Sequence, residues 1–337
     1  MPAKRPRLFY LDLIRTVALI SILIIHFNAS VTGYFTYPSR LFGSILPFGI
    51  YLGDFGSSLF FMVSGTALAF TTKEPFSAMA FYKKRAKAVY PMFWLAWCIF
   101  FSLRFVTRPW YYASAKPVTL ILTVLGLDNY AVAAGWVSQD FACVGEWFLG
   151  SILFLYLLFP LLRAGLKHHP VLTWAAAAAV CLPVHAAGWD AHLLAVHLLE
   201  FLFGMTFLRF GKRAKILTAV VCAVFLLSPL WKLDSKITCA LASALVFVVL
   251  AWLGGRIHCL PLQNFCALAG KYSYAIFLTH HVIILRLVEA FDLSAITRRD
   301  TVLLFGAYLF LVGLISALLF RLDKAVRSGT AALFAKS

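Results

Sequence analysis

Apolar runs of about 20 residues recur along the whole of this 337-residue chain. A helix of about 20 residues crosses the hydrocarbon core of a bilayer, where every backbone group must be paired internally. With 62% hydrophobic and only 13% charged residues, the chain cannot enclose these runs within a water-soluble surface. The sequence therefore predicts an all-α, polytopic membrane helix bundle that forms a single integral membrane domain over residues 1–337.

Ten of the apolar runs are long enough to be spans, and one further apolar segment is not. In residues 117–133 the apolar stretch ends before Asp128, which leaves it short for a crossing. We assign this segment to a long outer loop, as a re-entrant or interfacial helix. The ten predicted spans are 8–28, 48–70, 88–106, 147–166, 171–189, 192–209, 215–231, 237–254, 272–290 and 301–320.

The positive charge of the chain indicates its orientation. Thirty Lys and Arg residues against 13 Asp and Glu give a formal net charge of +17. A nucleic-acid-binding protein would gather such charge on one face, but here it lies in short clusters between apolar runs, so no nucleic-acid partner is expected. With the N-terminus inside, about 20 of these cations lie in cytoplasmic segments and about 7 in outer ones. Both termini are therefore predicted to face the cytoplasm.

The first predicted span contains three ionisable residues, Asp12, Arg15 and His26. Ionisable residues inside a membrane are costly and mark functional sites or buried pairs. Arg15 and His26 are eleven positions apart, so they point within about 20° of the same direction and lie about 16 Å apart along the helix. Asp12 can pair with Arg15. Two interpretations remain here: a functional stripe, or a neutralised pair with His26 capping the helix among outer headgroups.

Five segments along the chain have charged, aromatic and small residues in a recognisable register. In the first, ten residues separate Arg15 from His26. The segments are LDLIRTVALISILIIHF at 11–27, GSSLFFMVSG at 56–65, FYKKRAKAVYP at 81–91, WFLGSILFLYLLFP at 147–160 and GKYSYAIFLTHH at 270–281. In this order, and spread over nearly the whole chain, they resemble the motifs of the acyltransferase-3 family.

The chain departs from the family pattern at three positions. Ser58 stands where many members have Asp or Pro, and Ala88 replaces an Arg for which Lys87 is the nearest substitute. A Glu that one large subgroup has in the fourth segment is Ile152 here. Any role that depends on that carboxylate falls to Glu146, the nearest alternative.

The resemblance implies an integral membrane O-acyltransferase that moves an acyl group, usually acetyl, from cytoplasmic acyl-CoA to a hydroxyl. It implies a multi-pass protein of a bacterial-type plasma membrane. Its implied partners are the lipid bilayer, acetyl-CoA or another acyl-CoA as donor, and a cell-envelope glycan or glycolipid as acceptor. No residue of this sequence selects among the acceptors that family members use.

Acyl transfer to a hydroxyl needs a base, a held donor and a group that stabilises charge on the carbonyl oxygen. Histidine suits proton transfer near neutral pH, so His26 is the candidate general base, and we prefer direct transfer to an acyl-histidine relay. Arg15 is the second candidate, either as an anchor for the CoA end or as a structural brace of the first helix. Lys84 and Arg85 match the family register for CoA binding, although the positive-inside rule also explains basic residues there.

The same resemblance identifies candidate substrate-binding residues in the later segments. These are Glu146, Trp147, Tyr156 and His280. His280 is chosen over His281, and a structural hydrogen bond is the alternative role for it.

No metal ion is predicted. His185, His192 and His197 gather near the outer ends of two predicted spans. However, His192 and His197 are five residues apart, which is about 140° around a helix, so they do not converge on one ion. His197 is instead expected to pair with Glu200, three residues later.

Two other functions remain open. A transporter or flippase for a glycan or lipid-linked substrate would also place Arg and His along a path through the membrane. Many such proteins have internal repeats, and none is evident here. A noncatalytic scaffold would leave the Arg15 and His26 register without a purpose.

Overall fold

Helices make up most of the protein. The computed structural model describes residues 8–33, 41, 43–188, 194–228, 233–293 and 296–334. Within these ranges the longer helices are α1 (Phe9–Asn28), α2 (Leu52–Thr71), α3 (Ala78–Thr107), α6 (Trp147–His168), α7 (Pro170–Ala186), α8 (Leu194–Phe207), α9 (Lys212–Leu227), α10 (Ser235–Gly254), α11 (Leu260–Glu289) and α12 (Arg298–Phe334). Each overlaps one of the predicted spans, which confirms an all-α bundle.

Six helices in the described ranges are long and apolar enough to cross a membrane, namely α1, α2, α3, α6, α10 and α12. The helices α7 and α8 are apolar but shorter. A multi-pass membrane protein is therefore supported by both length and hydropathy. Ten crossings, with both termini in the cytoplasm, stay a prediction.

Three helices begin well away from the predicted starts of their spans, and one of them is α11, which begins at Leu260, twelve residues before the predicted span 272–290. A 3₁₀ turn at Pro47–Gly49, with φ of 66° at Phe48, delays the start of α2 from 48 to Leu52. This turn joins the short antiparallel strands β1 (Ile45–Leu46) and β2 (Ile50–Tyr51). By contrast, α3 begins ten residues before its predicted span, so the basic segment is part of the helix. Ser77 caps the N-terminus of this helix by accepting a hydrogen bond from the Ala80 amide.

The segment 117–133 does not form a crossing helix. It contains a 3₁₀ turn (Pro117–Thr119) and two six-residue helices, α4 (Leu120–Leu125) and α5 (Asp128–Ala133). Gly126 lies between the two helices with φ of 71°, a conformation that favours glycine and ends α4. The expectation that this segment is not a span is confirmed, and its place in an outer loop as a re-entrant or interfacial helix stays a prediction.

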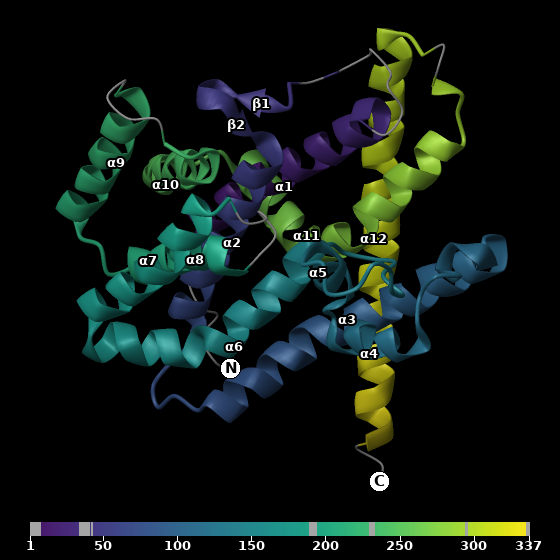
Figure 1. Ribbon diagram of the computed structural model, residues 1–337, viewed down its shortest axis with the longest axis horizontal. Helices are drawn as coiled ribbons and strands as arrows, with labels where there is room; N and C mark the ends of the chain where they lie inside the picture. Colours follow the sequence, from purple (N-terminus) through teal and green to yellow (C-terminus); the bar gives the residue numbers. More distant parts are fainter. Residues whose placement is uncertain are drawn as a thin grey trace.

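The first helix lies inside the bundle. It contacts α2, α10 and α11, and α2 packs in turn against α8. The long helix α12, yellow in Figure 1, runs beside α11 and α3. Because α1 is enclosed by other helices, polar side chains along it face protein rather than lipid.

The helices α2 and α8 cross at very short range through two glycines. A Cβ added at Gly65 would lie 2.2 Å from the carbonyl oxygen of Phe201, and one at Gly204 would lie 2.0 Å from that of Met62. Small residues permit such close approach between membrane helices. This crossing gives Gly65 a packing role.

Replacing Gly65 by alanine is expected to destabilise the protein, because the new methyl group must push two backbones apart. Overpacking of this kind costs about 1–3 kcal/mol of the free energy of unfolding. Gly313→Ala is the matched control, since a Cβ at that helical position meets no atom within 4 Å. Thermal unfolding of the two variants in detergent measures the difference. Equal midpoints for both variants would contradict a tight crossing.

Candidate active site

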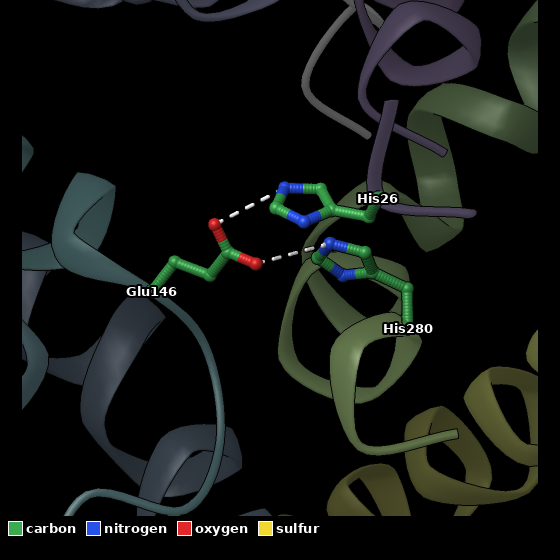
Figure 2. Close-up of side chains that lie close together, drawn as sticks. All are labelled: His26, Glu146 and His280. Atoms are coloured by element: carbon green, nitrogen blue, oxygen red, sulfur yellow. Dashed lines mark ion pairs between the residues drawn. The ribbon is translucent and has the colours of Figure 1, made fainter. Parts of the chain in front are cut away.

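Three imidazoles surround one carboxylate where α1, α6 and α11 meet. Glu146 immediately precedes α6, His26 lies in the last turns of α1, and the His280 and His281 pair lies on α11. Oε2 of Glu146 is 3.2 Å from Nε2 of His26. Oε1 is 3.2 Å from Nδ1 of His281 and 3.6 Å from Nε2 of His280. Figure 2 shows the His26 and His280 rings directed at the same carboxylate, which can orient both rings and stabilise a proton on either.

The backbone ahead of α6 brings Glu146 against α11. Gly145 has φ of 69°, and Glu146 is extended, with φ −153° and ψ 177°. A Cβ on Gly145 would lie 3.2 Å from the ring of Phe277 on α11. Glycine at this position therefore permits both the turn and the close approach that place the carboxylate beside the histidines.

The ring of His280 is fixed by its own helix. Its Nδ1 lies 3.0 Å from each of the carbonyl oxygens of Ile276 and Phe277. Because a carbonyl only accepts, Nδ1 holds the proton of these contacts. In the neutral ring Nε2 is then an acceptor that faces Oε1 of Glu146, and neither atom has a hydrogen-bond partner among the described residues. A hydroxyl placed between them could donate to either atom.

A cavity of about 540 Å³ extends from this cluster along α1. Arg15 and Arg85 line it together with His26, and the helix positions place Arg15 about 16 Å from His26 along the axis. The Nε atom of Arg85 is buried and has no hydrogen-bond partner among the described residues. The wall between the two ends is mainly apolar and includes Leu19, Ile22, Leu23, Phe60, Phe148 and Ile152.

Arg15 also forms the ion pair that its spacing predicted. Its Nη1 lies 3.1 Å from Oδ1 of Asp12. Gly270 of α11 packs against this pair, since a Cβ there would lie 2.9 Å from the same oxygen. The pair thus lies within α1 and packs against α11 while the guanidinium lines the cavity, so the two roles considered for Arg15 are compatible.

A second cavity, of about 410 Å³, reaches the cluster from other elements. Its lining comes from the end of α3 and the 3₁₀ turn that follows it, from α5, the segment between α5 and α6 and the start of α6, and from α11. Of the described residues, it shares Glu146 and Trp147 with the larger cavity. Two molecules could therefore approach Glu146 from different sides without competing for the same space.

A comparison with known protein families explains why a membrane helix bundle contains this buried histidine cluster. Residues 8–321 match the family model Acyl_transf_3, described as an acyltransferase domain. The chain belongs to the acyltransferase-3 family. It is therefore a membrane acyltransferase, and the resemblance found in the five segments is confirmed. Comparison with curated proteins and with solved structures gave no match.

Most of the site residues predicted from the acyltransferase-3 motifs lie around one cavity. Those that line the larger cavity are Arg15, His26, Arg85, Glu146, Trp147, Tyr156 and His280. Lys84 is exposed on α3 and is not among the described residues of this lining. The functional roles of all eight residues remain predictions.

The other histidines singled out in the sequence lie in structural contacts. His197 pairs with Glu200 as predicted, with 2.8 Å between Nδ1 and Oε2, and Ser58 donates to Oε1 of the same carboxylate at 2.6 Å. His185 lies 3.6 Å from Oδ1 of Asp234. His192 lies outside the described residues.

Sequence reasoning missed three features of the site. It found no partner for the His26 ring, which the structure provides in Glu146. It passed over His281, which contacts the same carboxylate, and Arg104, which lines the second cavity. A glycine followed by an acid at the start of an apolar helix was the available signal for Glu146. Arg104 was visible as a charge within a predicted span.

The cluster also has the composition of a metal-binding set. One ligand atom from each of His26, Glu146 and His280 lies within 4.8 Å of the others. The backbone contacts of His280 Nδ1 resemble those that orient metal-bound histidines. The prediction of no metal considered other histidines, so a divalent cation here is a separate hypothesis that a chelator can test.

Proposed function

We propose that the protein transfers an acetyl or related acyl group from acyl-CoA to a hydroxyl of a cell-envelope glycan or glycolipid, with His26 as general base. The observation that carries this proposal is the 3.2 Å contact between Nε2 of His26 and Oε2 of Glu146 at the junction of two cavities. A buried histidine oriented by a carboxylate is an arrangement that activates hydroxyl groups in acyl transfer.

In the proposed reaction, Glu146 accepts the Nε2 proton of His26 in a hydrogen bond and so leaves a lone pair on Nδ1. That lone pair takes the proton of the acceptor hydroxyl as its oxygen attacks the thioester carbonyl carbon. The carbon–sulfur bond then breaks, and the CoA thiolate leaves and takes the proton from the imidazolium. Glu146 stabilises the imidazolium between these steps. His280 Nε2 offers an acceptor that can position a hydroxyl of the substrate.

The larger cavity supports binding of the donor in an extended form. Two guanidiniums, Arg15 and Arg85, lie at the end away from His26 and suit the phosphates of CoA. The apolar wall between them and His26 suits the arm that carries the thioester. In this proposal the CoA phosphates lie on the predicted cytoplasmic side and the acyl group lies beside the base.

Replacing Arg85 by glutamine is expected to raise KM for acetyl-CoA by about 10-fold or more, with a smaller effect on kcat. A hydrogen bond to a charged group contributes about 1.5–3 kcal/mol, and 1.4 kcal/mol corresponds to a factor of ten. Lys83→Gln is the matched control, because it removes the same charge from an exposed neighbour on α3. Equal KM changes in both variants would indicate a general electrostatic effect instead of a contact in the cavity.

Mass spectrometry of surface glycans from cells with and without the gene tests the proposed function. We expect an acetylated glycan that disappears without the gene, returns with the wild-type protein and does not return with His26→Ala. Movement of a glycan across the membrane without consumption of acetyl-CoA would instead favour the transporter alternative. Incubation with labelled acetyl-CoA and no acceptor separates direct transfer from an acyl-histidine relay, since only the relay leaves label on the protein.

A further inference from the structure

We infer that the second cavity binds the acceptor and that Arg104 selects acceptors with an anionic group, a carboxylate or a phosphate, near the reacting hydroxyl. The inference rests on the proposed acyl transfer for the identity of the reaction. It adds a ligand class and a specificity-determining residue that the transfer mechanism itself does not require.

The position of the second cavity suits an acceptor. It reaches Glu146 and His281, yet most of its lining is distinct from the wall of the larger cavity. In the predicted orientation, the end of α3 and the segment between α5 and α6 lie on the outer side. An acceptor in this cavity would therefore reach the histidine cluster from the side opposite the CoA phosphates.

Arg104 differs from the neighbouring arginines because no carboxylate among the described residues pairs with it. Its guanidinium lies 4.5 Å from the ring centroid of Tyr111, and no carboxylate lies within 4.0 Å of it among the described residues. One turn later, Arg108 pairs with Glu289 at 2.7 Å, and Arg286 pairs with the same carboxylate at 3.4 Å. A guanidinium near the end of a span that lacks an acidic partner, beside neighbours that have one, indicates a site for an external anion.

The electrostatics of the cavity support an anion beside Arg104. Arg104 is the guanidinium on the described lining of this cavity. The acids on the lining are Glu146, which is surrounded by three imidazoles, and Asp140. Burial raises the pKa of Asp140, whose Oδ1 accepts a hydrogen bond from the Ala142 amide.

The remaining lining suits a saccharide. The side-chain amide of Asn129 donates to the carbonyl of Val144, and that of Gln139 donates to the carbonyl of Tyr111. These bonds use the amide nitrogens and orient both side chains, whose oxygens can accept hydrogen bonds from sugar hydroxyls. Tyr111 and Trp147 provide aromatic faces in the same cavity. The cavity thus combines hydroxyl acceptors with one guanidinium, the chemistry of an acidic sugar site.

A set of three probe acceptors tests this selectivity in the full-length protein in nanodiscs with acetyl-CoA. The probes are p-nitrophenyl β-D-glucuronide, the neutral p-nitrophenyl β-D-glucoside, and glucose 6-phosphate. We expect kcat/KM for at least one anionic acceptor to exceed that for the glucoside by about 10-fold or more. This is the effect expected from one hydrogen bond to a charged group. The better of the two anions identifies carboxylate or phosphate as the recognised group.

Arg104→Gln is expected to remove the preference, so that kcat/KM for the anionic acceptors falls to about that for the glucoside, while Arg108→Gln retains the preference. Equal rates with all three acceptors in the wild type, or a preference that survives Arg104→Gln, would overturn the inference. So would an equal loss with charged and neutral acceptors, which indicates a structural role for Arg104.

Binding measured without acetyl-CoA separates this inference from the proposed transfer. We expect an anionic probe, and not the glucoside, to raise the thermal midpoint of the wild type, with no such shift in Arg104→Gln. That result without any acetylation would support the anion site and count against the transfer reaction. No selective shift in the wild type would overturn the anion site even if the protein transfers acetyl groups.

Discussion

Replacement of His26 by alanine is expected to lower acyl transfer by about 10²–10⁴-fold, the range for loss of a general base. The physical reason is that, among the described residues, only His26 lies on α1, contacts Glu146 and lines the larger cavity. The measurement is transfer of label from acetyl-CoA in membranes, normalised to the amount of folded protein. Binding of the donor should change little, because the predicted anchors Arg15 and Arg85 remain.

A matched histidine change separates chemistry from folding. His168→Ala alters an exposed histidine at the end of α6 and should leave activity unchanged. His26→Gln keeps a polar side chain of similar size but cannot exchange a proton near neutral pH, so it should be as inactive as the alanine variant. A folded His26→Ala protein with the wild-type rate would remove His26 from the mechanism.

The helical architecture could be read from the sequence because the bilayer imposes a strong rule. A run such as 237–254 must be helical if it crosses lipid, and α10 is found at Ser235–Gly254. Boundaries were less predictable where local chemistry overrides hydropathy. The Pro47–Gly49 turn delays α2, and the basic start of α3 is helical although it is not apolar.

Part of the site was accessible because helix geometry relates distant positions on one helix. The eleven-residue interval between Arg15 and His26 predicted a shared face, and both residues line one cavity. The partner of His26 could not be found this way. Glu146 lies 120 positions later, and its contact with His26 depends on how the segment before α6 lies against α11, which packs against α1. Such a contact belongs to tertiary packing, which periodicity within one helix cannot reveal.

The second cavity was unpredictable for a related reason. Besides parts of α3, α5 and α11, its walls include the segment between α5 and α6, whose path follows turns and single hydrogen bonds rather than a repeating pattern. Asn129 and Gln139, for example, are oriented by bonds to backbone carbonyls. In the sequence Arg104 is a charge within a predicted span, and the structure shows that, unlike Arg108, it lines this cavity and has no carboxylate within 4.0 Å among the described residues.

Replacement of Glu146 by glutamine is expected to lower acyl transfer by about 10²–10⁴-fold while preserving the shape of the side chain. The amide cannot stabilise the imidazolium of His26 as the carboxylate does. Its nitrogen can also donate to Nε2, which would leave the proton of the neutral ring on Nδ1 and block the base. The effect should therefore fall on kcat, with little change in KM for acetyl-CoA.

Two further measurements define what Glu146 contributes. Glu146→Asp retains the charge but shortens the reach to His26, so partial activity is expected, between wild type and the glutamine variant. A chelator separates proton transfer from a metal centre formed by His26, Glu146 and His280. On the general-base mechanism, EDTA leaves the wild-type rate unchanged, whereas loss of activity that zinc restores would assign these three side chains to a metal. On the proposed mechanism, His26 cannot keep its full rate as general base once it loses its only described carboxylate contact. A glutamine variant with the wild-type rate would therefore limit Glu146 to a structural role.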